Sequence, residues 1–427
     1  MWVVFLKISL YRRADERAES SGQDVVELLL TSSITNISSP TASFTFKLAS
    51  HNEGREAKKE SVDRIKDHAA AFAYFLEHLK NESKIKRESI VHVCHRVVHG
   101  GDYFEPVIIN SESYQHIENL SDLAPLHNGA ALSVMKSTID SLPKASSIAY
   151  FDTSFHRSIP LHVARYAINP EVAHKRGRKK YGFRGPSYAY ILGAVGHYLQ
   201  KDTSALNLIV MHLGSGASIC AIRNGQSLDT SMGLTPVSGL PGATRSGLVD
   251  LSLIFHYRNR AVWITHDQTV DVRVTQAEEI LNTESGWKAL TGTSDFNEVV
   301  KNMQEHLQQQ GAMKGRDVVD WQSKATWKLK FDLFRVVDRR LGGRADAIVF
   351  SGGIDERSAE LREAVVRSSE CLRSRLDEAA NVKVSQQEGV VVSAGKRTDL
   401  DVWRVLVCRI DEQVGNSLWS LVLAMYC

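Results

Sequence analysis

The chain of 427 residues lacks most of the features that mark secreted and membrane proteins. Only a few apolar residues precede Lys7, so the N-terminus is too short for a signal peptide or a membrane span. No CxxC spacing occurs, which favours free thiols in a reducing compartment. The five cysteines are Cys94, Cys220, Cys371, Cys408 and Cys427. We therefore expect a cytoplasmic protein with no membrane partner.

An excess of charge of one sign is also missing. The net charge is +3 at pH 7, and the densest basic run, residues 175–180, is interrupted by a glycine. No nucleic-acid partner is expected from such a surface. No low-complexity linker or internal repeat stands out either. The length nevertheless predicts two domains, and contents of 43% hydrophobic and 24% charged residues are ordinary for a globular protein.

The most informative stretch covers residues 207–250. Residues 208–213 form an apolar run that predicts a buried strand, and this run stops at the small residues 214–216. Residues 217–223 predict a second strand, followed by an Asn-Gly hairpin signal at 224–225. A turn of small residues between strands leaves backbone N–H groups free to hold phosphate oxygens, with a plain structural turn as the alternative. The pattern is neither a Walker loop nor a Rossmann fingerprint.

Two arginines are candidate anion ligands. Arg245 lies in a second glycine-rich loop, residues 239–247, and its guanidinium can grip an anion with two N–H groups. Arg96 lies near the end of the apolar run 89–101, where a guanidinium is costly unless an anion meets it. The three histidines of that run could ligate a metal, but histidines at the core edge or facing a substrate are the more common arrangement.

A carboxylate ends another predicted strand. Residues 147–152 form an apolar run that closes on Asp152, which is a candidate general base or magnesium-water ligand, with a turn-capping aspartate as the alternative. Periodicity also predicts other elements. These are strands at 2–11, 34–48 (broken at Pro40), 345–350 and 403–408, and helices at 61–79, from a capping box at 275–278, at 321–341 and at 356–373.

Seven ordered motifs resemble the acetate kinase family, specifically its fungal branch, within the acetate and sugar kinase/Hsp70/actin superfamily. They are HRVVHGG (95–101), LAPLHN (123–128), FDTSFH (151–156), YGFRG (181–185), MHLGSGAS (211–218), MGLTPVSGLPGATRSG (232–247) and FSGGI (350–354). The resemblance implies an α/β protein with two duplicated actin-like (ribonuclease H-like) βββαβαβα domains and an interdomain active-site cleft. The expected domains are residues 1–153, completed by about 409–427, and residues 154–408.

The resemblance also implies the activity. Such proteins transfer the γ-phosphoryl group of ATP reversibly to acetate, giving acetyl phosphate and ADP, with Mg²⁺ required. They are usually homodimers joined through the second domain. Phosphoryl transfer from ATP to a carboxylate requires cationic groups around the transferring group and an apolar pocket around the acetate methyl.

The family's site residues carry over by motif. Arg96 and Arg245 would hold the acetate carboxylate and the phosphoryl group, Asp152 would be the catalytic carboxylate, and His127 a hydrogen-bond donor. Arg184 would face the phosphoryl group. The methyl pocket would be Val98, Leu126, Phe183 and Pro236. The nucleotide-binding residues would be Lys7, His212, Leu213, Gly214, Ser215, Gly216, Asp295, Phe296, Asn297, Gly353, Ile354, Asp355, Glu356 and Arg357, and the magnesium ligand Glu412.

Several departures from the family pattern bear on function. The family's first phosphate loop, Asn-x-Gly-Ser-Ser-Ser-x-Lys, is represented here only by Lys7, so we expect the first strand and its loop to be missing. Arg184 replaces a histidine, and Asp355 replaces a glycine and would place a carboxylate facing the polyphosphate. Asn297 and Arg357 replace an arginine and an asparagine, and the charged closing helix is absent. The alternatives are therefore a degenerate or truncated member that binds nucleotide without turnover, or a propionate or butyrate kinase.

Overall fold

A computed structural model describes most of the chain. The described residues are 5–13, 26–37, 41–49, 58–83, 85–122, 125–250, 252–253, 276–296, 298, 301, 345–368, 374–387, 389–395, 403–409 and 422–426. The chain divides into two compact units. Unit 1 comprises residues 1–154, 266–273 and 411–427, and unit 2 comprises residues 155–265 and 274–410.

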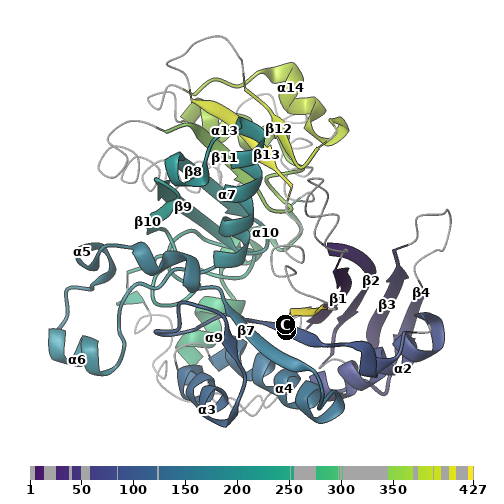
Figure 1. The fold of residues 1–427 in the computed structure, drawn as a ribbon. Coiled ribbons are helices and arrows are strands. Elements are labelled where there is room, and N and C mark those ends of the chain that lie inside the picture. The colour runs from purple at the N-terminus through teal and green to yellow at the C-terminus, as the bar shows by residue number, and fades with distance from the viewer. Residues whose placement is uncertain are drawn as a thin grey trace. The chain divides into compact units, whose positions relative to one another are not determined.

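Unit 1 is built on an eight-stranded sheet in the order β4-β3-β2-β1-β14-β5-β7-β6 (Figure 1). Strands β4 to β1 and β14 pair antiparallel to one another, whereas β14, β5 and β7 run parallel and β6 pairs antiparallel with β7. The strands are β1 (Phe5–Arg13), β2 (Val26–Thr35), β3 (Ala42–Leu48), β4 (Lys58–Val62), β5 (His92–Val97), β6 (Val107–Ile108), β7 (Ser146–Phe151) and β14 (Val422–Tyr426).

Helices of unit 1 supply apolar side chains to its core. The α-helices are α2 (His68–Ser83), α3 (Ser111–Asn119) and α4 (Pro125–Ser141), and short 3₁₀ turns lie at Arg87–Ser89 and Leu120–Asp122. Helix α2 begins where the Asp67 carboxylate accepts the N–H of Ala70 at 2.7 Å, which caps its first turn. Its buried Phe72 and Phe75 belong to one core cluster with Phe44 and Phe46 of β3. Burying an aromatic ring contributes on the order of 1.5–3 kcal/mol.

Unit 2 contains a six-stranded sheet in the order β10-β9-β8-β11-β13-β12. Strands β8, β11 and β13 are parallel, and the outer strands pair antiparallel. The strands are β8 (Leu208–Leu213), β9 (Ala217–Arg223), β10 (Gln226–Thr230), β11 (Ala347–Ser351), β12 (Val391–Ser393) and β13 (Arg404–Cys408). The helices are α5 (Leu161–Ala164), α6 (Pro170–Lys175), α7 (Gly185–Leu199), α9 (Gln276–Thr283), α10 (Gly286–Thr291), α13 (Ala359–Ser368) and α14 (Glu378–Val382), with 3₁₀ turns at Ser154–Ser158, Thr203–Ala205 and Lys383–Gln386.

The central strands of unit 2 are buried on both faces, which explains their continuous apolar sequences. Every residue of β8 is buried, and Leu208 and Val210 belong to the core cluster that contains the apolar face of α7. Ile209 and Met211 point the other way and belong to the cluster that contains Val365 of α13. A parallel sheet covered on both faces is built from such strands.

Most predicted elements of unit 2 are confirmed, and one predicted helix of unit 1 is present but begins later than predicted. Strands β8 and β9 have the predicted bounds, and β10 follows the turn at 224–225. The helix predicted over residues 61–79 begins only at His68, because residues 58–62 pair with β3 as β4. The run 34–48 forms the end of β2 and all of β3, and the helix predicted at 356–373 is seen as α13. The helix at 321–341 and Thr275 of the predicted capping box lie outside the described residues.

Among the described residues, no helix is long and apolar enough to cross a bilayer.

Candidate active site

The turn between β8 and β9 is the centre of the candidate site in unit 2. The strands are joined by three residues, Gly214, Ser215 and Gly216, and the Gly214 N–H donates to the Gly216 carbonyl at 3.0 Å. His212 near the end of β8 is only 3% exposed, whereas Ser215 is exposed. The turn of small residues therefore follows directly from the end of a buried strand, as the sequence predicts.

Two guanidinium groups lie against this turn. A Cβ atom added at Gly216 would lie 2.7 Å from Nη2 of Arg184 and 3.0 Å from Nη1 of Arg245. Glycine is required here because any side chain would displace these cations. Arg184 also donates from Nη1 to Nδ1 of His212, at 3.0 Å. Two permanent positive charges and a turn of backbone N–H groups make a site for a multiply charged anion.

The loop that carries Arg245 is fixed on two sides. The Ala243 N–H donates to the Ser215 carbonyl at 2.8 Å, which joins the loop to the β8–β9 turn. On the other side, Trp287 and Lys288 of α10 donate their N–H groups to the carbonyls of Gly242 and Ala243, at 3.2 and 3.0 Å. The backbone from which the Arg245 side chain extends is therefore held by hydrogen bonds on both sides.

Two segments predicted to hold the nucleotide, the one after β8 and the one after β11, are joined by a backbone hydrogen bond and lie beside one apolar cluster. The Ile354 N–H donates to the Leu213 carbonyl at 3.1 Å, and the Ile354 side chain packs against the buried pair Ala243 and Trp287. The Trp287 ring meets the Phe296 ring edge-on, with centroids 5.9 Å apart. Sequence reasoning missed Trp287, although a tryptophan in a Gly-Trp pair beside a predicted nucleotide segment was an available signal. Asp295 is exposed, and Asn297 lies outside the described residues.

The loop after β11 corrects one expectation. Asp355 is fully buried, so its carboxylate does not stand at the loop surface, where the sequence placed it facing a polyphosphate. Burial raises the pKa of Asp355 well above its ordinary value, which favours the neutral acid. The loop is closed by the Gly352 N–H, which donates to the Glu356 carboxylate at 3.0 Å, whereas Gly353 and Arg357 are exposed.

In unit 1, Arg96 and Asp152 form a bidentate ion pair. Nε and Nη2 of Arg96 donate to the two carboxylate oxygens at 2.8 and 2.9 Å, and Asp152 is 2% exposed. The strands β5 and β7 are parallel neighbours whose carboxyl ends meet at the same sheet edge, which brings the two residues together. The sequence predicted both residues as site residues but not their pairing.

The first turn of α4 is anchored beside the end of β5. The fully buried Asn128 accepts the N–H of His99 at 3.1 Å and donates to the His99 carbonyl at 3.0 Å. Leu126 and His127 lie in this turn, and their side chains lie outside the described part of the structure. Asn128 was missed as a positioning residue, although it belongs to the LAPLHN motif.

Two of the three histidines of the 89–101 run lie in the core, whereas His92 is half-buried. His95 is completely buried, and burial lowers its pKa to about 3, so the imidazole is neutral at physiological pH. His99 is also buried. Within the described residues, no three His, Cys, Asp or Glu side chains are placed to hold a metal ion.

The remaining predicted residues differ in their exposure. Phe183 is buried, and Val98 and Pro236 are half-buried. Lys7 lies exposed within β1 and not in a loop, with Nζ 5.7 Å from the Phe5 ring centroid. Glu412 lies outside the described residues.

Solved structures of the same fold are kinases. A propionate kinase from Francisella tularensis aligns with a TM-score of 0.79 and 26% identity over 98% of both chains. Acetate kinase from Porphyromonas gingivalis aligns with a TM-score of 0.76 and 26% identity over 96% of this chain and 95% of that one. With its two mixed sheets and the glycine turns that follow their strands, the molecule is an α/β protein of the actin-like kinase class.

Sequence relatives narrow this class to one family. A probable acetate kinase of Emericella nidulans is 40% identical over 90% of both chains, and acetate kinase of Streptomyces coelicolor is 32% identical over 85% of this chain and 84% of its own. The family model described as "Acetokinase family" matches residues 24–414. The chain belongs to the acetokinase family, which confirms the resemblance found in its motifs.

Proposed function

We propose that this chain is an acetate kinase that transfers the γ-phosphoryl group of ATP reversibly to acetate, giving acetyl phosphate and ADP. Membership of the acetokinase family supports the activity. The single observation that carries the mechanism is the approach of two guanidinium groups to Gly216 in the β8–β9 turn. A nucleotide kinase needs such an arrangement because its substrates and transition state carry several negative charges.

The reaction forms one bond and breaks another at phosphorus. An acetate oxygen attacks the γ-phosphorus, and the bond to the β–γ bridging oxygen breaks, so that ADP leaves with the electron pair. Charge spreads over three equatorial oxygens, and Arg184, Arg245 and the turn N–H groups stabilise that charge. His212 holds Arg184 through its Nδ1 atom.

The acyl acceptor is proposed to bind at the Arg96–Asp152 pair. Acetate is already ionised at neutral pH, so its attack requires no general base. Asp152 therefore serves by holding both ends of the Arg96 guanidinium fork, which fixes the direction of the remaining N–H groups. His127, at the start of α4, is proposed as an additional donor to the transferring group.

Four apolar residues are proposed to surround the acetate methyl group, namely Val98, Leu126, Phe183 and Pro236. Pocket volume discriminates poorly between acyl chains, because one methylene changes the binding free energy of the transition state by only about 1–3 kcal/mol. The fold neighbour from Francisella tularensis is a propionate kinase, which makes propionate the relevant competitor. Comparing kcat/KM for acetate, propionate and butyrate tests the assignment, and a clear preference for a longer acid would overturn it.

Magnesium is proposed to arrive with the nucleotide. Mg²⁺ is commonly held by one or two carboxylates, water and substrate phosphates rather than by a complete protein cage. Glu412 is the proposed protein ligand, and activity that persists fully in excess chelator would contradict the requirement.

We further propose a homodimer in the cytoplasm. Segment 161–172 of unit 2 exposes several large apolar side chains, including Leu161 at 63%, Ile168 at 49% and Val172 at 49%. Exposed apolar clusters of this kind often mark protein interfaces. Sedimentation of the wild type and of a Leu161→Glu, Ile168→Glu variant tests this, and an unchanged dimer would exclude this segment as its interface.

A hydroxamate assay for acetyl phosphate tests the activity directly. Arg245→Ala should lower kcat by about 10²–10³-fold, which is the usual loss of rate when one hydrogen-bond donor to the developing charge is removed. Arg176→Ala, at an exposed position after α6, is the matched control and should retain full activity. Nucleotide binding without turnover in the wild type would instead support the non-catalytic alternative.

A further inference from the structure

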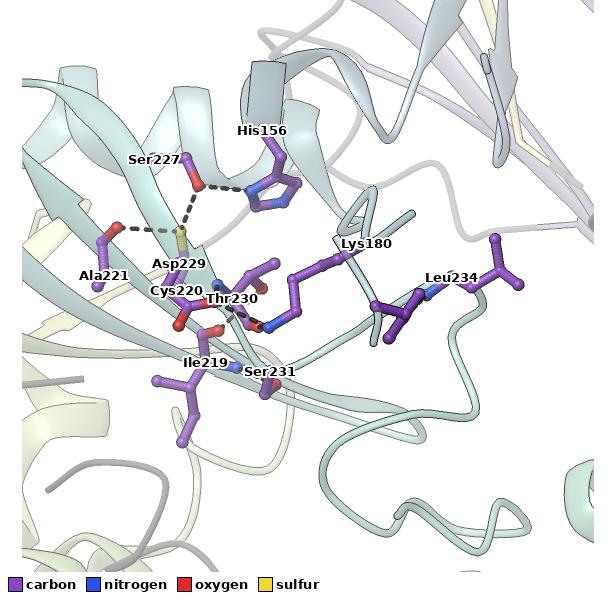
Figure 2. Close-up of polar contacts among 11 residues, drawn as sticks. His156, Lys180, Ile219, Cys220, Ala221, Ser227, Asp229, Thr230, Ser231 and Leu234 are labelled. Atoms are coloured by element: carbon purple, nitrogen blue, oxygen red, sulfur yellow. Dashed lines mark hydrogen bonds and ion pairs between the residues drawn. The ribbon is translucent and has the colours of Figure 1, made fainter. Parts of the chain in front are cut away.

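His156 joins two parts of unit 2 that are far apart in sequence. It is 4% exposed and lies in the short 3₁₀ turn that follows β7. Its Nε2 atom is 2.9 Å from the Phe183 carbonyl, and its Nδ1 atom is 2.7 Å from Oγ of Ser227 in β10. Figure 2 shows the ring directed at Ser227, which in turn lies beside Cys220 of β9.

The partners fix the orientation of this ring. A carbonyl oxygen only accepts hydrogen bonds, so Nε2 carries a proton and donates to Phe183. The Ser227 hydroxyl, which can donate or accept, lies against Nδ1. Because both ring nitrogens have a partner, the imidazole is held in a single orientation.

The backbone that His156 holds is unusual. Gly182 has φ of +74°, and a Cβ atom there would lie 2.6 Å from Cδ2 of His156, so the ring packs directly on the chain. Arg184 itself has φ of +66° and ψ of +27°, the left-handed conformation, which a residue with a side chain adopts only at a cost. Such a conformation persists only where its surroundings impose it.

The other end of the same segment is fixed by β10 and the loop after it. Nζ of Lys180 donates to the Asp229 carboxylate at 2.9 Å and to the Thr230 carbonyl at 3.0 Å, as Figure 2 shows. The N–H groups of Tyr181 and Gly182 both donate to the Gly233 carbonyl, at 3.1 and 3.2 Å. The hydrogen bond from His156 acts on Phe183, the residue immediately before Arg184.

We propose that His156 is a positioning residue that sets the left-handed conformation of Arg184 and thereby holds its guanidinium at the Gly216 turn. This proposal rests on the proposed function, because it assigns Arg184 to the transferring phosphoryl group. The positional effect acts through the Phe183 carbonyl, and His156 itself touches no substrate.

Kinetics of four variants test the proposal. His156→Leu should lower kcat by about 10²-fold, the scale expected for misplacing a catalytic group by about 1 Å, with a much smaller change in KM for acetate. His156→Gln retains an N–H donor and should recover part of this loss. Ser158→Ala is the matched control, because Ser158 donates to the Ser227 carbonyl at 2.7 Å but does not contact residues 181–184 through that bond. In an Arg184→Ala background, His156→Leu should cause almost no further loss.

Hydrogen exchange provides a readout that does not depend on activity. His156→Leu should increase exchange at the Tyr181 and Gly182 amides, while those of β8 and β9 stay protected. A loss of kcat that is equal in both Arg184 backgrounds, or unchanged exchange at 181–182, would overturn the proposal. If the wild type lacks kinase activity, the proposed function fails, and exchange at residues 181–182 still decides whether His156 holds this turn.

Discussion

The sheets of the two units share one six-stranded plan. Strands β2-β1-β14-β5-β7-β6 of unit 1 correspond in order to β10-β9-β8-β11-β13-β12 of unit 2. The strand directions also match. In each set the first strand is antiparallel to the second and the second to the third, the third, fourth and fifth run parallel, and the sixth pairs antiparallel with the fifth. In both units the middle one of the three parallel strands, β5 or β11, is followed by a glycine pair. The pair comes directly after β11, whereas two residues separate it from the end of β5.

The units differ in where the central strand comes from. In unit 2, β8 precedes β9 directly, and the three-residue turn between them carries the cationic site. In unit 1, the same position is filled by β14, whereas its antiparallel partner β1 lies at the other end of the chain. The comparison shows that strand pairing can be preserved while connectivity changes.

The largest predicted effect comes from proline in each central strand. Ala424 pairs with β1 and β5, as Val210 pairs with β9 and β11, and proline at either site removes a ladder hydrogen bond. We expect Ala424→Pro to raise amide exchange in β1 and β5 by about 10²-fold, since a cost of about 3 kcal/mol corresponds to roughly two factors of ten. Val210→Pro should do the same in β9 and β11. If the β1 amides of Ala424→Pro exchanged as slowly as those of the wild type, β14 would not correspond to β8 as a central strand.

The next effect concerns the turn found only in unit 2. Gly216→Ala should lower kcat by about 10²-fold, because the new Cβ displaces the ends of two flexible arginines and leaves the fold intact. Gly193→Ala, at an exposed position of α7, is the control, since a Cβ atom there would enter open space. Steady-state kinetics with circular dichroism measure both. Equal losses in the two variants would show that the guanidinium contacts at Gly216 have no special role.

A smaller effect distinguishes the aspartates that follow the glycine pairs. Asp355 is buried, and burial raises its pKa, whereas Asp102 in unit 1 is exposed. A raised folded-state pKa means that the stability contributed by Asp355 is present at low pH and is lost as pH rises through that pKa. Asp355→Asn should therefore stabilise the protein at pH 8 more than at pH 5, measured by urea denaturation. Asp102→Asn, at an exposed position, is the control for removing a carboxylate, and a stabilisation of Asp355→Asn that is larger at pH 5 would contradict the burial argument.

The smallest effect is on thiol reactivity. Burial raises the pKa of Cys94, Cys220 and Cys408 to about 12, so all three should resist iodoacetamide at pH 8 in the folded protein. Cys94 lies opposite Ala424 in the sheet of unit 1. In Ala424→Pro we expect Cys94 to be alkylated while the two thiols of unit 2 stay protected. Mass spectrometry of the labelled peptides measures this, and simultaneous labelling of all three would indicate that the units do not unfold separately.

Local patterns predicted the parts of the molecule that depend on neighbouring residues. The run of β8, the Asn-Gly turn after β9 and the glycine turns follow from spacing alone, and the motifs identified the family. The Arg96–Asp152 pair and the His156–Ser227 bond join residues 56 and 71 positions apart, so no local pattern reveals them. The same holds for β14, whose partners lie hundreds of residues earlier. Asp355 was misplaced because sequence gives the residue type at a turn but not the direction of its side chain.

The late position of β14 also sets an order of events during synthesis. Domains generally fold as units while the ribosome extends the chain, with N-terminal ones first. Here the opposite order follows, because all of unit 2 is translated before the strand that completes the sheet of unit 1. Until β14 is made, the backbone N–H and C=O groups on the facing edges of β1 and β5 have no strand to pair with. Such edges can pair with strands of other chains. Chaperone dependence during expression is therefore expected to reside in the half of the protein that is made first.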